Sequence, residues 1–143
     1  GRWMIIRVSW LCGRFGSNFV KTMLKLTGEK EHLKVVNDQI GSPTYCFDVV
    51  EKTMALIERK ETGYFHISSK PAITWFDFTK EIIELTGSKT KLEAVSSETF
   101  PAVTRRPAYS YLKTQKVEEL GLEPIHWKDG LKTLLNQLKK SDT

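Results

Sequence analysis

Side chains suited to ligand binding follow the end of an expected strand in the stretch Val-Val-Asn-Asp-Gln-Ile-Gly-Ser-Pro-Thr, residues 35–44. Asp38 and Gln39 come directly after the β-branched residues, and Gly41 and Pro43 then indicate a turn. Open α/β sheets bind ligands in the crevice beyond the carboxyl ends of their strands, where such groups would meet a ligand. The sequence therefore offers a candidate binding loop, with an ordinary turn before a helix cap as the alternative.

Trp10 and Arg106 add two further kinds of contact. Trp10 follows an expected strand at residues 3–9, where an indole ring can stack on a ligand ring or close the core. Arg106 lies between Arg105 and Pro107, and a guanidinium group can hold two phosphate oxygens at once. The alternative for the arginine pair is an ordinary solvated surface.

A dinucleotide-binding turn is suggested by Gly13 and Gly16, which follow the first expected strand and precede an expected helix. Asp38 would then be the acid that binds a ribose. Phe19, however, replaces the third glycine, and its bulk opposes the close helix-to-strand approach that glycine permits. The sequence therefore argues against a complete cofactor fingerprint here.

Residues 109–113, Tyr-Ser-Tyr-Leu-Lys, match the Tyr-x-x-x-Lys spacing of a short-chain dehydrogenase proton relay. Such a relay needs the tyrosine and the lysine one turn apart on a helix, so that the ammonium group lowers the pKa of the phenol. Pro107 lies two residues before the tyrosine, and the next helix is expected only from residue 114. We therefore interpret the match as accidental.

The composition is that of one globular α/β domain of 143 residues, with 40% hydrophobic and 27% charged side chains. The formal net charge of +5 favours an anionic partner such as a nucleotide, a phosphorylated metabolite or nucleic acid. No helix-turn-helix, zinc-finger or aromatic RNA-binding pattern supports nucleic acid, and no apolar run suffices to cross a membrane. Cys12 and Cys46 form no metal-binding or redox motif, so we expect buried, reduced thiols and a cytoplasmic location.

Alternating strands and helices must position these side chains. Residues 3–9 read as a nearly continuous apolar strand, which we expect to be covered on both faces of a parallel sheet and to begin a βαβ unit. Such a strand needs neighbours, so we expect the sequence to be a piece of a longer protein. The expected strands are residues 3–9, 33–37, 63–68 and 92–95, and the expected helices are 18–26, 47–59, 75–86, 114–120 and 126–139.

Four stretches, in this order and spacing, resemble the dTDP-4-dehydrorhamnose reductase family over essentially the whole chain. They are Ile-Arg-Val-Ser-Trp at 6–10, Ser-Asn-Phe-Val-Lys-Thr-Met-Leu at 17–24, residues 35–44, and Arg-Pro-x-x-Ser-x-Leu at 106–112. The resemblance implies the C-terminal part of an extended short-chain dehydrogenase, which is the end of a Rossmann-like sheet plus a small α/β substrate-binding domain. Residues 1–143 would be this carboxyl-terminal portion. An upstream Rossmann domain would bind NADPH or NADH and supply the catalytic tyrosine and lysine, so the 143 residues alone are expected to be inactive.

The resemblance also implies roles for individual residues. Trp10 would pack on the sugar, and Ser9 would lie near the nicotinamide of the cofactor. Arg106 would hold a phosphate oxygen, and Asp38 would move to the substrate side of the cleft. The implied groove for the nucleotide diphosphate is lined by Asn18, Asp38, Gln39, Thr44 and Arg106. Two departures from the family pattern, Leu-Cys-Gly at 11–13 and Arg105 in place of serine, leave the sugar preference open.

Members of this family reduce dTDP-6-deoxy-L-lyxo-4-hexulose to dTDP-L-rhamnose, which is used in bacterial surface polysaccharides. The resemblance therefore implies a dTDP-sugar as the partner and NAD(P)H as the cofactor, and it allows a homodimer. Two alternatives stay open: a reductase-like regulatory subunit, as occurs beside methionine adenosyltransferase, and a related nucleotide-sugar epimerase or reductase. An upstream Tyr-x-x-x-Lys and glycine-rich loop would distinguish an enzyme from a regulatory subunit.

Overall fold

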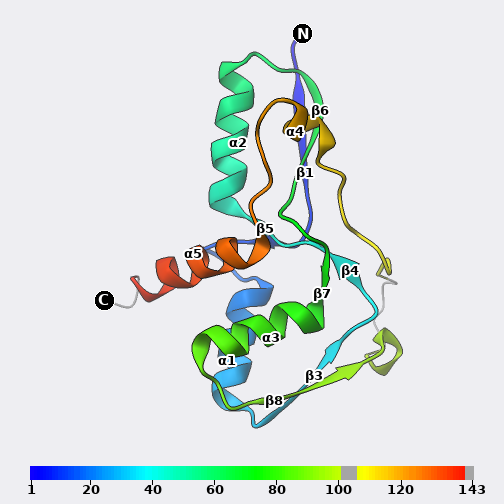
Figure 1. Ribbon diagram of the computed structural model, residues 1–143, viewed down its shortest axis with the longest axis vertical. Helices are drawn as coiled ribbons and strands as arrows, with labels where there is room; N and C mark the ends of the chain where they lie inside the picture. Colours follow the sequence, from blue (N-terminus) through cyan, green and yellow to red (C-terminus); the bar gives the residue numbers. More distant parts are fainter. Residues whose placement is uncertain (101–105, 141–143) are drawn as a thin grey trace.

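The computed structural model describes residues 1–100 and 106–140 and has the α/β architecture expected from the sequence. The molecule is elongated, with an upper part around β1, β6 and α2 and a lower part around β3, β8, α1 and α3 (Figure 1). The strands are β1 (Met4–Val8), β2 (Leu11–Cys12), β3 (His32–Val36), β4 (Ile40–Gly41), β5 (Thr44–Tyr45), β6 (Gly63–Ile67), β7 (Ile73–Thr74) and β8 (Lys91–Val95). The helices are α1 (Phe19–Glu29), α2 (Cys46–Glu58), α3 (Trp75–Thr86), α4 (Gln115–Glu119) and α5 (Trp127–Lys139), with a 3₁₀ turn at Ser97–Thr99.

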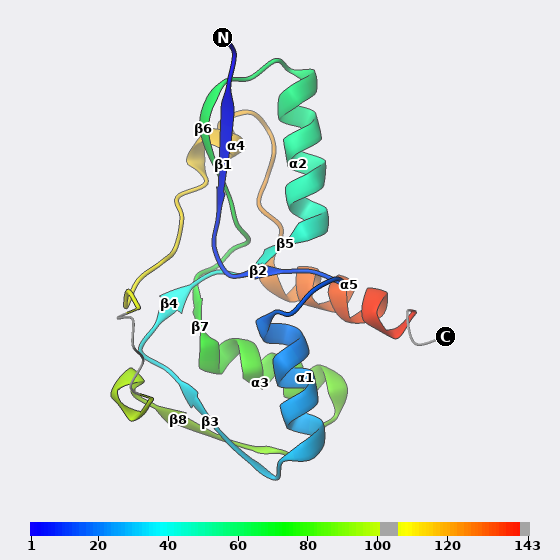
Figure 2. The same ribbon diagram turned by 180° about the vertical axis from the view of Figure 1, so that it is seen from behind.

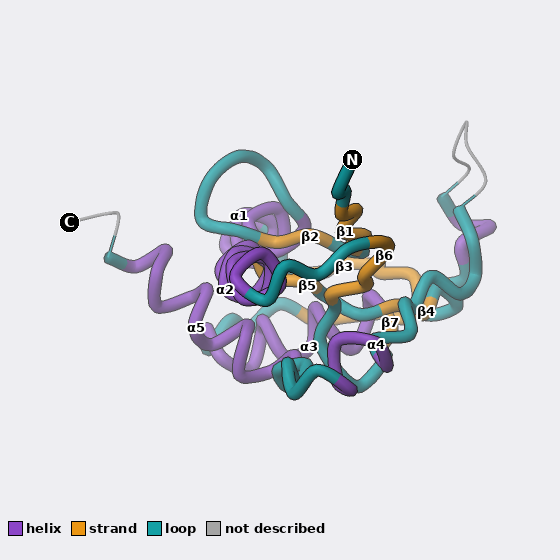
Figure 3. The backbone as a smooth tube through the Cα atoms, turned by 90° about the horizontal axis from the view of Figure 1, so that it is seen from above, coloured by secondary structure: helices purple, strands orange, loops and turns teal. Residues whose placement is uncertain are grey.

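The upper part is built on β1 and β6, which pair in parallel over all five residues of each strand. α2 lies alongside this pair in both side views (Figures 1 and 2). Leu56 of α2, Phe65 of β6 and Val117 of α4 are buried together in a small core of their own. Figure 3 shows α2 and α4 next to the β1–β6 pair, so these two helices form the layer that covers one face of the pair.

The other face of the β1–β6 pair is open. Trp3, Ile5 and Tyr64 lie on it with exposed fractions of 53%, 44% and 49%, and the Trp3 and Tyr64 rings meet edge to face at 5.1 Å. Within residues 1–100 and 106–140, β1 pairs with β6 alone, so its second edge carries no strand. The described residues therefore cover β1 on one face, and the covering of its second face, expected for residues 3–9, stays a prediction.

The lower part holds a second parallel pair, β3 with β8, flanked by α1 and α3 (Figure 2). The expected βαβ unit is wrong, because β1 pairs with β6 and β3 with β8. The physical reason lies at Trp10, whose φ of 46° turns the backbone in the left-handed region. After this turn β2 pairs with β5, and α1 begins in the lower part instead of returning along β1.

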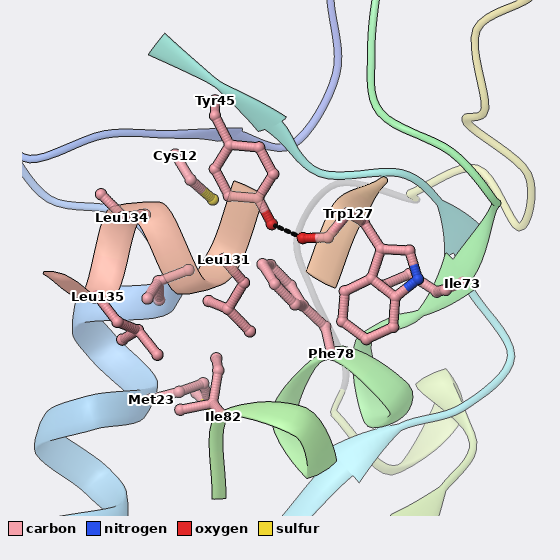
Figure 4. Packing of buried hydrophobic residues seen from close by; sticks show 11 residues of the cluster. Cys12, Met23, Tyr45, Ile73, Phe78, Ile82, Trp127, Leu131, Leu134 and Leu135 are labelled. Atoms are coloured by element: carbon pink, nitrogen blue, oxygen red, sulfur yellow. Dashed lines mark hydrogen bonds between the residues drawn. The ribbon is translucent and has the colours of Figure 1, made fainter. Parts of the chain in front are cut away.

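The main core lies where α1, α3 and α5 meet (Figure 4). Tyr45 of β5 is fully buried there, and its hydroxyl donates to the carbonyl oxygen of Trp127 at 2.6 Å. Gly130 of α5 approaches the Tyr45 ring so closely that a Cβ atom would lie 2.2 Å from ring atom Cε2. Only glycine allows this approach of helix to ring. The other buried members are Cys12, Val20, Met23, Ile73, Phe78, Ile82, Leu131, Leu134 and Leu135.

α3 is fixed at both ends by local sequence. The Thr74 hydroxyl accepts from the Asp77 N–H at 3.1 Å, and the Asp77 carboxylate accepts from the Thr74 N–H at 3.0 Å, which is a capping box. Gly87 ends the helix with a φ of 68°. The capped start fixes the place of Trp75, the first residue of the helix.

The two cysteines are both free but differ in exposure. Cys12 is buried as expected, whereas Cys46 is exposed at the start of α2, so the expectation of a buried thiol is wrong for Cys46. The Cys46 sulfur lies close to Gly13, so the residue sits at the edge of the core and keeps part of its surface open to solvent.

Candidate functional site

An open cleft of about 1650 Å³ lies among the carboxyl ends of β1 and β3, the start of α3 and residues 106–110. The structure brings five of the seven predicted site residues together there. They are Ser9, Trp10, Asp38, Gln39 and Arg106. The crevice therefore lies beyond the carboxyl ends of β1 and β3, which belong to two separate strand pairs.

Trp10 forms one wall of the cleft. Its indole ring stacks on that of Trp75, with centroids 3.5 Å apart and planes 12° apart. The indole Nε1–H donates to the hydroxyl oxygen of Ser110 at 3.1 Å. Trp75 thus covers one face of the Trp10 ring, so a ligand cannot stack on that face. The left-handed backbone at Trp10 costs roughly 1–2 kcal/mol, and the structure holds it in place.

Asp38 joins the β3 end of the cleft to the 3₁₀ turn after β8. Its Oδ2 accepts from the Ser97 backbone N–H at 2.8 Å and from the Ser97 hydroxyl at 2.9 Å. These two donors hold the pKa of the Asp38 carboxyl below its ordinary value. Asp38 is therefore an anion at neutral pH. Ser97 and Glu98 line the same cleft, so the turn that Asp38 caps forms part of its wall.

The segment that carries Arg106 lies against β4. The Ile40 N–H donates to the Ala108 carbonyl oxygen at 2.8 Å, and the Ser110 N–H donates to the Ile40 carbonyl oxygen at 2.8 Å. These bonds bring Arg106 and Pro107 to the cleft rim, with the Arg106 side chain exposed. Arg105, named with it in the sequence, lies outside the described residues. Lys34 of β3 also lines the cleft, and its ammonium group lies 3.8 Å from the Glu93 carboxylate.

Asn18 and Thr44 are not brought to the cleft. Asn18 caps α1: its carboxamide oxygen accepts from the Lys21 N–H at 3.2 Å, and its NH₂ group donates to the Gly13 carbonyl oxygen at 2.8 Å. Thr44 is fully buried, and its backbone N–H donates to the Trp10 carbonyl oxygen at 3.1 Å. Thr44 therefore supports the cleft wall from behind without lining it.

Trp75 and Ser110 are among the cleft residues to which the sequence reasoning gave no binding role. Trp75 was expected only to pack from a helix. Its hydrophobic character predicts packing, and it does not reveal that the residue also faces a cleft. Ser110 was part of the Arg-Pro-x-x-Ser-x-Leu motif, which was the available signal, but its partner Trp10 becomes apparent only in the fold. Both residues contact Trp10 and so help to build the wall of the cleft.

Residues 109–113 form no helix, so Tyr109 and Lys113 do not share a helical face. The helical geometry that a proton relay needs is therefore not present at these residues. Among the described residues, no three His, Cys, Asp or Glu side chains come together as metal ligands. In the same part of the chain, no helix has both the length and the apolar character needed to span a bilayer.

Comparisons with known proteins identify close relatives. A family model described as the RmlD substrate binding domain matches residues 1–140. The spore coat polysaccharide biosynthesis protein SpsK of Bacillus subtilis is 43% identical over 133 residues, which cover 93% of this chain and 47% of that protein. A crystal structure of a dTDP-4-dehydrorhamnose reductase from Clostridium acetobutylicum superposes with a TM-score of 0.92 at 39% identity, over 95% of this chain and 49% of that one. A dTDP-4-dehydrorhamnose reductase from Bacillus anthracis in complex with NADP superposes with a TM-score of 0.91 at 37% identity, over 96% and 49%.

The chain spans about half the length of these relatives. Their agreement along nearly all of this chain confirms the fold class and the resemblance that the four sequence stretches indicated. The chain therefore belongs to the RmlD substrate-binding domain family.

Proposed function

We propose that this chain is the substrate-binding portion of a dTDP-4-dehydrorhamnose reductase, which reduces dTDP-6-deoxy-L-lyxo-4-hexulose to dTDP-L-rhamnose with NAD(P)H. The observation that carries the proposal is the cleft, where Trp10, Asp38, Gln39 and Arg106 meet from three separate segments. Membership of the RmlD substrate-binding domain family supports the same ligand class. The proposed partner is a dTDP-sugar.

The two ends of a dTDP-sugar match different groups in the cleft. A diphosphate carries negative charge, and the Arg106 guanidinium can hold two of its oxygens, with Lys34 as a second cation. A deoxy sugar has an apolar face that can pack against the part of the Trp10 indole that lines the cleft. Asp38 has further acceptor capacity beside its two bonds from Ser97, and it can accept from a hydroxyl of the ligand.

The proposal places the cofactor site and the catalytic tyrosine and lysine in an upstream Rossmann half. The length of the relatives and the open face of β1 support this division. A second support is α2, where Val50, Met54 and Ile57 follow helical spacing and have exposed fractions of 61%, 52% and 54%. Apolar side chains on a strand and on a neighbouring helix form the kind of surface that another part of a protein covers.

Bound NAD(P)H would supply the hydride in this proposal. Ser9, at the carboxyl end of β1, lines the cleft, and its hydroxyl donates to the Ser42 carbonyl oxygen at 3.2 Å. This bond fixes the hydroxyl on the cleft floor, where it would lie nearest the nicotinamide. Residues 1–143 alone are expected to show no reductase activity, and NADPH oxidation by the purified 143-residue chain would contradict that expectation.

The site is tested by titrating the full-length protein with dTDP. Arg106→Ala removes the proposed phosphate contact, and a hydrogen bond to a charged group contributes about 1.5–3 kcal/mol, so the Kd should rise at least tenfold. Lys132→Ala is the matched control, because it also removes one positive charge but lies on α5, away from the cleft residues. An unchanged Kd for Arg106→Ala would remove Arg106 from the site. An absence of dTDP binding by the unsubstituted protein would refute the proposed ligand class.

A further inference from the structure

Ser110 is the residue at which the Trp10 indole and the Arg106 segment are joined. Its hydroxyl oxygen accepts from the indole Nε1–H at 3.1 Å and donates to the Ile40 carbonyl oxygen at 3.3 Å. Its backbone N–H donates to the same carbonyl oxygen at 2.8 Å. The hydroxyl is therefore used both as donor and as acceptor within the protein.

The Trp10 ring is held on further sides. Trp75 covers one face by stacking at 3.5 Å. Gly41 approaches the ring so closely that a Cβ atom there would lie 2.5 Å from Cε2 of the indole and 2.7 Å from the Ser110 hydroxyl oxygen. The ring is thus confined by Trp75, Gly41 and Ser110 before any ligand arrives, and Ser110 supplies the one hydrogen bond among these contacts.

The same serine ends the short segment that brings Arg106 to the cleft. The Ile40 N–H bond to Ala108 and the Ser110 N–H bond to Ile40 hold residues 106–110 along β4. The indole is bonded to this segment through the Ser110 hydroxyl alone. One hydrogen bond therefore links the Trp10 ring to the segment that carries the Arg106 guanidinium group.

We propose that Ser110 is a positioning residue that fixes Trp10 and Arg106 relative to each other, so that one nucleotide-sugar reaches both. This inference rests on the proposed function, because it takes the ring as the sugar contact and the guanidinium as the diphosphate contact. A ligand that bridges two groups binds more tightly when their separation is set beforehand. Without the hydroxyl, the indole N–H lacks its acceptor, and only the packing against Trp75 and Gly41 still holds the ring.

The test is a double-mutant cycle on the full-length protein, with dTDP-L-rhamnose as the titrated ligand. Ser110→Ala should weaken binding by about three- to tenfold, the usual range for one neutral hydrogen bond. Trp10→Phe lacks the indole N–H, so adding Ser110→Ala to it should change the Kd by less than about twofold. Ser17→Ala, in an exposed loop, is the matched control and should bind as the unsubstituted protein does. Ser110→Cys keeps a weak acceptor and should fall between serine and alanine.

The outcomes separate this inference from the proposed function. If the unsubstituted protein binds the ligand and Ser110→Ala binds equally well, the positioning role is overturned and the proposed function stands. Additive effects of Ser110→Ala and Trp10→Phe would overturn it as well, because a shared hydrogen bond gives non-additive effects. If the unsubstituted protein binds no dTDP-L-rhamnose, the proposed function fails and the positioning role fails with it.

Discussion

Gly130→Ala should destabilise the protein although it places a better helix former in α5. A Cβ atom at this position would lie 2.2 Å from Cε2 and 2.4 Å from Cδ2 of Tyr45. The Tyr45 ring cannot move away easily, because it is fully buried and its hydroxyl is bonded to the Trp127 carbonyl oxygen. Overpacking of this kind costs about 1–3 kcal/mol, and the helix propensity of alanine offsets up to about 1 kcal/mol. Because a contact of 2.2 Å calls for the upper part of the overpacking range, we expect a net loss of about 1–2 kcal/mol in the free energy of unfolding.

Gly28→Ala is the matched control for this substitution. Gly28 lies in α1, and a Cβ atom there would have no neighbour within 4 Å, so only the propensity gain of up to about 1 kcal/mol applies. Urea unfolding followed by tryptophan fluorescence should lower the midpoint for Gly130→Ala and raise it for Gly28→Ala. If Gly130→Ala were as stable as the unsubstituted protein, the close approach of α5 to Tyr45 would not limit packing, and the reasoning would be refuted.

Two further predictions concern titration and reactivity. The Ser97 donors hold the pKa of Asp38 low, so an NMR titration should give Asp38 a pKa below that of a free aspartate. Ser97→Ala should raise this pKa. An ordinary pKa in the unsubstituted protein would contradict the two hydrogen bonds. Because that pKa is depressed on folding, these bonds stabilise the fold above the unfolded-state pKa and stop doing so as the pH falls through the folded-state pKa. Burial raises the pKa of the Cys12 thiol to about 12. Iodoacetamide at pH 8 should therefore leave Cys12 unmodified in the folded protein and alkylate it in urea. Equal labelling of Cys12 in the two states would argue against its burial.

Hydrophobic periodicity predicted the longer elements well, and α2, α3, β6 and β8 begin and end within two residues of the expected bounds. It could not predict which strands pair, because strand pairing is decided by contacts between distant segments. The two-residue strands β2, β4, β5 and β7 were missed for the same reason, since they exist only through their partners. The left-handed turn at Trp10, which separates the two parts of the molecule, has no signal in residue type, because glycine or asparagine would be expected there.

The candidate site was predicted in outline. Trp10, Asp38 and Arg106 were named from chemistry and resemblance, and the fold brings them to one cleft. Thr44 is different: its residue type suits a ligand contact, but its hydroxyl lies among buried groups of the fold, 3.4 Å from the Ile67 carbonyl oxygen. A sequence shows which groups are available, and it does not show which of them the protein uses internally.

The open edge of β1 bears on how such a protein is made. A strand with one unpaired edge and exposed apolar side chains accepts any extended segment, including the same strand of another molecule, and so favours aggregation. In the proposed full-length protein, the Rossmann half leaves the ribosome first. The surface that covers β1 would then already be folded when Trp3 and Ile5 emerge, and this proposed order of the two halves would protect the nascent chain during synthesis.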